Sequence, residues 1–152
     1  MNNSVDRFGR KVSYLRVSVT PRCNLRCAYC MPKDGPPLYP GSEMLTIRQI
    51  TKLVGIYAEL GINKIRITGG EPLVRKGIAA LVRDLKALKG IDQVTMSTNG
   101  VLLGKMIPLL TEAKLDRINI SLDTLRPDRM KEITGYDVFD KVISVIRKIA
   151  AE

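Results

Sequence analysis

The sequence contains no histidine and no tryptophan, and only three cysteines occur among its 152 residues. Without histidine, the chain has neither a histidine acid or base for catalysis nor a histidine ligand for a metal. A closed structural zinc site takes four nitrogen or sulfur ligands, so three cysteines are too few unless a second chain contributes. The odd number of cysteines also argues against a closed disulfide framework.

Long hydrophobic runs are missing as well, since none approaches the roughly 20 residues that a membrane-spanning helix needs. The first eleven residues are polar and hold no hydrophobic core of a secretion signal. We therefore expect a cytoplasmic chain with reduced thiols and no membrane partner. The remaining composition, with 45% hydrophobic and 26% charged residues, is typical of one globular domain with a real core.

Negative charge is scarce relative to positive charge, because 25 Lys and Arg outnumber 15 Asp and Glu for a net charge of +10. This excess fits either a solvated basic surface or an anionic partner such as a nucleotide phosphate. Aromatic residues make up only 5% of the chain, so few side chains are available to stack on the bases of a single-stranded nucleic acid. A nucleic-acid partner would rest on charge alone, and we do not expect one.

The chain does contain an alternation of strand and helix patterns. A period of two between apolar and polar residues predicts strands at 14–20, 64–68, 93–97 and 117–123. Helical spacing predicts helices at 47–60, 78–88, 106–113, 128–133 and 142–149. Thr46 and Gln49 form a capping box before the first helix, and Pro108 fits the first turn of the third. This order predicts an α/β fold with a parallel sheet and right-handed crossovers.

Each predicted strand has one apolar and one polar face, although strands covered on both faces should be apolar throughout. The apolar faces can pack on the helices, so the polar faces must share a common space. In a curved, barrel-like sheet that space is the lumen, and a polar lumen favours a polar ligand over plain hydration. The polar set comprises Arg16, Ser18, Arg66, Thr68, Thr95, Ser97, Asn99, Asn119, Ser121 and Asp123.

All three cysteines lie within eight residues after the first strand, in the pattern Cys-x-x-x-Cys-x-x-Cys formed by Cys23, Cys27 and Cys30. Clustered thiolates on short irregular loops hold iron–sulfur clusters. Three thiolates on a four-iron cluster leave one iron without a protein ligand, and an open position distinguishes a reactive metal site from a structural one. Arg22 and Arg26 beside the thiols would favour the thiolate form. A Pro- and Gly-rich loop is expected to follow at 32–42.

Gly69-Gly70-Glu71-Pro72 directly follows the second strand. Two glycines let backbone groups approach a ligand closely. Alone, this segment would be read as an ordinary strand-to-helix turn, and only the cysteine triplet beside it makes it informative.

Together these segments resemble the radical S-adenosylmethionine (SAM) superfamily, with Tyr29 as the aromatic before the last cysteine. More narrowly, the chain resembles the GTP 3′,8-cyclase family of molybdenum cofactor biosynthesis. The segments that carry this resemblance are 15–20, 22–27, 29–32, 64–73, 97–100 and 119–123. The cysteine motif identifies only the superfamily, whereas the combination of motifs indicates the family.

The resemblance implies a fold and a set of site residues. The fold would be a partial, half β/α barrel of the radical SAM type, with four parallel strand–helix units and polar strand faces lining the lumen. Cys23, Cys27 and Cys30 would ligate a 4Fe-4S cluster. Tyr29, Gly70 and Ser121 would contact SAM, and Arg16, Arg66 and Ser97 would contact GTP. A guanidinium suits a polyphosphate because it stays charged and donates paired hydrogen bonds.

The resemblance also implies the reaction. The reduced cluster, supplied by an external electron donor, would cleave SAM to methionine and a 5′-deoxyadenosyl radical. That radical would remove the ribose 3′ hydrogen of GTP, and the product would be 3′,8-cyclo-7,8-dihydro-GTP. The cofactor supplies the difficult step, and the protein positions it and excludes water. No histidine is needed for this scheme.

The sequence departs from the family at two residues and in its length. Pro21 stands where the family usually has Asp, and Ser97 keeps the hydroxyl of the usual Thr. The family's core has six strand–helix units and a C-terminal region with a second cluster, whereas only four units are predicted here. We therefore expect residues 1–152 to be one core domain, incomplete at its C-terminus, with an open edge at the fourth strand.

This shortness leaves alternatives open. Without strands five and six and the C-terminal cluster region, the isolated chain is expected to be inactive in GTP cyclisation. The open edge would suit a homodimer or a complementing C-terminal segment. A non-catalytic module that binds the cluster and SAM, or a different radical SAM enzyme, is the alternative to a cyclase.

Overall fold

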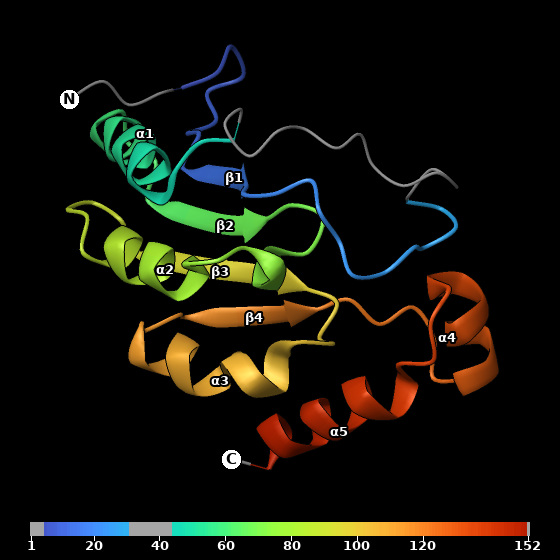
Figure 1. Cartoon of the computed structure of the whole chain (residues 1–152). Helices are drawn as coiled ribbons and strands as arrows, with labels where there is room; N and C mark the ends of the chain where they lie inside the picture. The colour runs from blue at the N-terminus through green and yellow to red at the C-terminus, as the bar shows by residue number, and fades with distance from the viewer. Residues whose placement is uncertain (1–4, 31–43, 152) are drawn as a thin grey trace.

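The computed structural model describes residues 5–30 and 44–151, which form one parallel sheet with helices (Figure 1). The four strands are β1 (Tyr14–Ser18), β2 (Lys64–Thr68), β3 (Gln93–Thr98) and β4 (Arg117–Ile120). They lie in the order β1-β2-β3-β4, and every neighbouring pair is parallel. The sequential parallel order confirms the predicted partial β/α barrel. The loop predicted at 32–42 lies outside the described residues.

Five α-helices connect or follow the strands in the described part of the chain. They are α1 (Ile47–Glu59), α2 (Ile78–Lys86), α3 (Leu103–Glu112), α4 (Pro127–Thr134) and α5 (Phe139–Ala150). The predicted capping box is present, because the Gln49 N–H donates to Thr46 Oγ1 and the Thr46 N–H donates to Gln49 Oε1. None of these helices is long and apolar enough to span a membrane.

The main core lies between the apolar strand faces and helices α1, α2 and α3. Ile65, Ile67, Val94 and Met96 of the two central strands have no exposed surface. Buried side chains from all three helices pack on them, including Val54 of α1. The periodicity therefore predicted the inward face of the sheet correctly.

Five boundaries differ from the sequence-based prediction by two residues or more. Strand β1 ends at Ser18 rather than at residue 20, α2 ends at Lys86 rather than at 88, and α5 begins at Phe139 rather than at 142. Helix α3 begins at Leu103 rather than at residue 106, because the fully buried Leu103 anchors an earlier turn that starts at Gly100. Pro108 therefore lies inside the helix and not in its first turn, at the cost of one intrahelical hydrogen bond. Strand β4 ends at Ile120, not at Asp123, since its partner β3 ends at Thr98 and the next N–H, that of Asn99, donates to Glu71.

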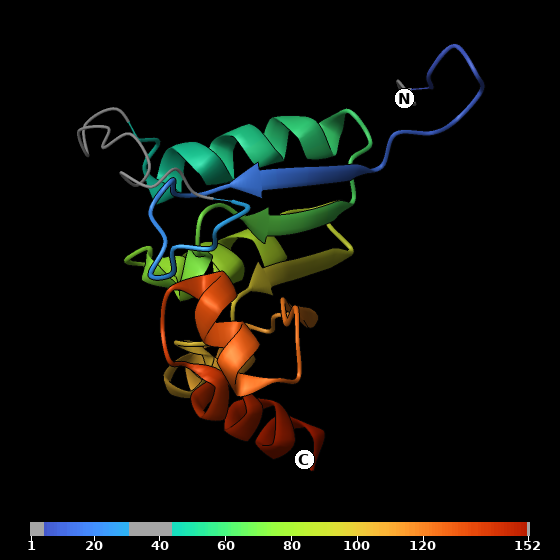
Figure 2. The same cartoon turned by 90° about the vertical axis from the view of Figure 1, so that its right-hand side faces the viewer.

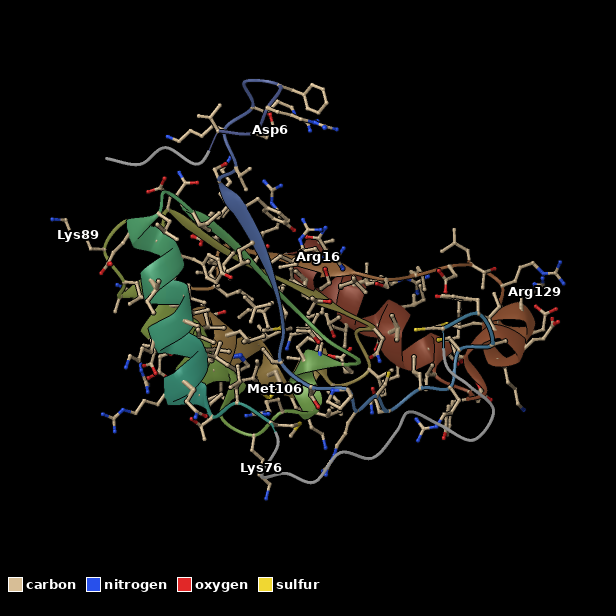
Figure 3. All side chains as sticks on the ribbon, turned by 90° about the horizontal axis from the view of Figure 1, so that it is seen from above. Asp6, Arg16, Lys76, Lys89, Met106 and Arg129 are labelled. Carbon is tan, nitrogen blue, oxygen red and sulfur yellow. The ribbon has the colours of Figure 1, made fainter. Side chains whose placement is uncertain are left out.

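The polar strand faces are aligned by the register of the sheet. Arg16 pairs with Arg66, Arg66 pairs with Thr95, and Ser97 pairs with Asn119. Thr95 is nevertheless buried, with its hydroxyl donating to the Ile65 carbonyl at 3.1 Å, so it is part of the sheet and unavailable to a ligand. Arg16 lies on the side of β1 that faces away from α1 (Figure 3).

All four strands end at one edge, and the cysteine loop and α4 lie beyond their arrowheads in two perpendicular views (Figures 1 and 2). The carboxyl ends of parallel strands are where α/β folds carry their sites. A functional site is therefore expected at this edge of the sheet.

Candidate functional site

The cysteine loop, residues 23–30, is fastened to the last turn of α4. The N–H groups of Arg26 and Ala28 donate to the carbonyls of Thr134 and Ile133, both at 2.9 Å. Leu25 is only 3% exposed and belongs to a small cluster with Val101, Met130 and Val142, against which Cys23 and Cys27 pack. The loop is thus held by its backbone and by one buried leucine.

The thiols of the loop are free, with Cys23 and Cys27 half-buried and Cys30 exposed. Burial raises the pKa of the Cys27 thiol, and the nearby Cys23, Asp123 and Cys30 raise it further. The predicted activation by Arg26 is not what the geometry shows, because its guanidinium donates to the carbonyls of Cys23 and Leu25.

The three thiols fit a 4Fe-4S cluster by their chemistry. They are free sulfur donors within eight residues of one irregular loop. In the part of the chain that the structure describes, no three Cys, Asp or Glu side chains already form a metal cage. The thiols would therefore have to converge when a cluster is bound.

The Gly69-Gly70 segment lies directly against the start of the cysteine loop. The N–H of Gly70 donates to Thr20 O at 2.7 Å, and the N–H of Glu71 donates to Arg22 O at 2.8 Å. A Cβ at Gly69 would lie 2.6 Å from the Thr20 carbonyl, and one at Gly70 would overlap the Arg22 carbonyl. Only glycine permits this approach, so the two motifs are joined backbone to backbone.

Glu71 is a site residue that the sequence analysis did not single out. Its side chain is 1% exposed, and its carboxylate accepts the Leu73 N–H at 2.9 Å, the Thr98 hydroxyl at 2.8 Å and the Asn99 N–H at 2.7 Å. Burial raises the pKa of Glu71, although these hydrogen bonds act in the opposite direction. Glu71 thereby connects the loop after β2 to the end of β3. The available signal was a carboxylate between two glycines and a proline, three positions after the last residue of β2.

The predicted SAM contacts are only partly brought together. Tyr29 and Ser121 line a small pocket with Cys27, Asn99 and Asp123, whereas Gly70 is not among the residues that line it. The Tyr29 hydroxyl donates to Asp123 Oδ2 at 2.7 Å, which raises the pKa of the tyrosine. This bond joins the cysteine loop to the segment after β4. The sequence predicts Asp123 on the polar face but does not predict its contact with Tyr29.

The predicted GTP contacts lie on the polar face of the sheet. Arg16 and Arg66 are neighbours in register, and Ser97 lies on β3, nearer the strand ends than the residue that pairs with Arg66. The Arg66 guanidinium carbon lies 5.6 Å from the centre of the Tyr14 ring. Its Nε is buried without a hydrogen-bond partner among the described residues. This donor is suited to an anionic ligand.

A larger pocket of about 610 Å³ lies between β1 and α1, away from the thiols. It is lined by residues such as Leu15, Val17, Leu53 and Tyr57, together with Arg16. We assign the site to the smaller pocket at the strand ends, because a functional site needs convergent polar groups as well as volume.

The fold and the cysteine loop define a class of protein. The family model described as the radical SAM superfamily matches residues 17–152, and the chain belongs to this superfamily. Membership implies a 4Fe-4S cluster and SAM as cofactors. The Streptococcus suis SuiB structure bound to precursor peptide SuiA shares the fold with a TM-score of 0.69. That likeness has 23% identity and covers 88% of this chain and 29% of the other.

Closer sequence similarity narrows the class. The chain is 48% identical over 149 residues to the GTP 3′,8-cyclase of Peptoclostridium acidaminophilum, covering 97% of this chain and 46% of the relative. It is also 48% identical over 141 residues to molybdenum cofactor biosynthesis protein 1 of Drosophila melanogaster, covering 93% of this chain and 25% of the relative. The chain thus spans about half the length of the bacterial relative and a quarter of the insect one.

Proposed function

We propose that this chain supplies part of the catalytic core of a cytoplasmic GTP 3′,8-cyclase, the enzyme that forms 3′,8-cyclo-7,8-dihydro-GTP for the molybdenum cofactor. The observation that carries the proposal is the junction of the cysteine loop, the Gly69-Gly70 segment and the end of β3 beside a polar face with Arg16 and Arg66. The similarity to named cyclases over nearly the whole chain supports the same substrate.

The residues take distinct roles in this proposal. Cys23, Cys27 and Cys30 would hold the cluster, which supplies the electron for cleavage of SAM when an external donor has reduced it. Gly70 would offer a backbone close to SAM, while Tyr29 and Ser121 would contact it from the small pocket. The buried cluster of Leu25 and Met130 would exclude water from beneath the loop.

The polar face would bind the triphosphate and sugar of GTP. Arg16 is exposed, and the half-buried Arg66 has an unpaired Nε, so both can donate to phosphate oxygens without breaking an ion pair between described residues. Ser97 would offer its hydroxyl nearer the cysteine loop. None of these residues needs to move a proton, and their work is to orient the ribose toward the cluster end.

We also propose that a 152-residue chain alone has little or no cyclase activity. Its relatives are about twice as long or longer, and β4 forms an open edge of the described sheet. A homodimer or a complementing C-terminal segment would be needed to close the substrate site. A non-catalytic module that binds the cluster and SAM remains the second candidate, favoured by this open edge.

Anaerobic reconstitution with iron and sulfide tests the proposal. We expect about four iron atoms and four sulfides per chain, with SAM binding. A variant with Cys23, Cys27 and Cys30 all replaced by Ala should bind neither cluster nor SAM. Well under one cluster per wild-type chain would contradict the central assignment. Reductive cleavage of SAM without GTP cyclisation would be the expected activity, and absence of cleavage would favour the non-catalytic module.

The GTP assignment has its own test. Arg66→Ala should weaken GTP binding to the reconstituted chain about tenfold, because a charge-assisted donor pair is lost. Arg83→Ala in the last turn of α2 is the matched control, and it should leave GTP binding unchanged. Equal binding by wild type and Arg66→Ala would remove the polar face from the substrate site.

A further inference from the structure

Asn99 lies where the loops after β1, β2 and β3 meet. Its backbone N–H donates to Glu71 Oε2 at 2.7 Å. Gly100 behind it has a φ of 80°, and a Cβ there would lie 3.1 Å from Ile120 Cγ2 and 3.2 Å from Val142 Cγ1. The turn is thus closed against the small cluster that supports the cysteine loop. Asn99 therefore projects its side chain from a rigid position.

The orientation of the Asn99 amide follows from its hydrogen bonds. The Val101 N–H donates to Asn99 Oδ1 at 3.0 Å, which identifies the oxygen side of the amide. The nitrogen must then face the cysteine loop, where it lies 2.8 Å from Asn24 Oδ1 and 3.8 Å from Cys23 Sγ. An amide nitrogen carries two hydrogens, and these two acceptors use both.

The sulfur of Cys23 receives a second donor, the N–H of Leu25 at 3.4 Å. Two N–H groups are thus directed at one of the three predicted cluster ligands. A metal-bound sulfur carries more negative charge than a neutral thiol, so both bonds would strengthen when the cluster is present. Hydrogen bonds to the sulfurs are among the features that set the reduction potential of an iron–sulfur cluster.

We propose that Asn99 is a positioning residue that holds Cys23 and raises the reduction potential of the cluster on the cysteine loop through its N–H···S hydrogen bond. Reduction adds one electron to the cluster, and a donor at the sulfur stabilises that added negative charge. The inference rests on the proposed function, since it requires the cluster. Beyond that function, it states that Asn99, 76 positions from Cys23 in the sequence, makes the cluster easier to reduce.

Two variants of the full chain distinguish the effect of the Asn99 NH₂ donor from that of the shape of the turn after β3. Asn99→Ser removes the NH₂ group without adding charge, and its hydroxyl can still accept the Val101 N–H. Asn99→Asp keeps the shape and the acceptor but replaces the donor by an oxygen. Thr111→Asp, at an exposed residue of α3 outside the polar face, is the control for one added negative charge.

The measurement is the ratio of reduced to oxidised cluster in the reconstituted chain. Each protein is poised with dithionite and mediators at the wild-type midpoint potential and read by electron paramagnetic resonance and visible absorption. Both Asn99 variants should lower this ratio about three- to tenfold, the factor expected from one hydrogen bond of ordinary strength. The control should stay within about twofold of wild type.

The outcomes distinguish this inference from the proposed function. A wild-type chain that takes up no cluster overturns both. A wild-type chain with a cluster, together with Asn99→Ser and Asn99→Asp proteins at the wild-type ratio, overturns the role of Asn99 alone. If Asn99→Asp is unfolded by circular dichroism, the neutral Asn99→Ser variant decides the question by itself.

Discussion

The two hydrophobic clusters of this chain differ in size and in what they support. Among the described residues, the cluster beneath the sheet has seventeen buried apolar members, whereas the cluster beneath the cysteine loop has four. Ile120 contacts both of them. The large cluster holds the scaffold, while the small one holds the thiols with the help of polar contacts from Glu71 and Asn99. Damage to the site should therefore be separable from damage to the fold.

The largest effect is expected from the large cluster. Ile65→Ala should lower the free energy of unfolding by about 4 kcal/mol, because Ile65 has no exposed surface and its loss leaves a cavity between the sheet and the helices. Chemical denaturation followed by circular dichroism measures this loss. Ile65→Val is the matched control and should cost about 1 kcal/mol. Equal destabilisation by both variants would show that the core collapses around the change.

Glu71 comes next, because it connects the two regions. Glu71→Ala should cost about 3 kcal/mol, since it leaves the Thr98 hydroxyl and the Asn99 and Leu73 N–H groups without their acceptor. The content of iron–sulfur cluster should fall as well. Chemical denaturation measures the loss of stability, and iron analysis measures the loss of cluster. Loss of stability with full cluster content would separate Glu71 from the site.

The pH dependence of stability sharpens this test. Burial raises the pKa of Glu71, so the native state binds its proton more readily than the unfolded chain does. The contribution of Glu71 to stability is then largest at low pH and declines as the pH rises through the raised pKa. Glu71→Gln does not titrate, so the stability difference between wild type and this variant should shift against the wild type with rising pH. A difference independent of pH would contradict the raised pKa.

Met130 tests the small cluster. Met130→Ala should lower the free energy of unfolding by about 2 kcal/mol, less than Ile65→Ala, because fewer buried neighbours surround it. For each kcal/mol of stability lost, Met130→Ala should reduce iron retention more than Ile65→Ala does. Leu125→Ala, whose side chain is 75% exposed, is the control and should change neither property. Full iron retention in Met130→Ala would mean that polar contacts alone hold the loop.

The smallest effect is expected at Tyr29. Tyr29→Phe removes an exposed hydrogen bond to Asp123 and should cost under about 1 kcal/mol. Hydrogen exchange of the amides in the cysteine loop should nevertheless become faster, because the bond to the segment after β4 is lost. Tyr57→Phe on α1 controls for loss of a phenol hydroxyl elsewhere. Unchanged exchange in the loop would mean that its other contacts, including the hydrogen bonds of Arg26 and Ala28, hold it without the Tyr29 hydroxyl.

Local patterns predicted the scaffold well because their causes are local. The alternation at 64–68 and the capping box of Thr46 and Gln49 depend on neighbours in the sequence, and both are present in the structure. Pro108 was misplaced because the burial of Leu103, a tertiary contact, decides where α3 begins. The ends of helices and strands thus depend on tertiary packing, which the apolar periodicity of the sequence does not reveal.

The candidate site was predictable in its motifs but not in its contacts. Cys23, Cys27 and Cys30 could be singled out by their spacing, and the glycines after β2 by their type. The Tyr29–Asp123 and Asn99–Cys23 contacts join residues that are 94 and 76 positions apart. Such pairs depend on how two strand ends are juxtaposed, and no single segment contains that information.

The attachment of the cysteine loop to α4 has a consequence for the order in which the protein is made. Arg26 and Ala28 bind the carbonyls of Thr134 and Ile133, which are synthesised more than 100 residues later. At about 5–20 residues per second, a ribosome needs about 5 to 20 seconds to reach them. During that interval the newborn thiols have none of these anchors. The cysteine loop can therefore reach its anchored form only after residue 134 has been synthesised.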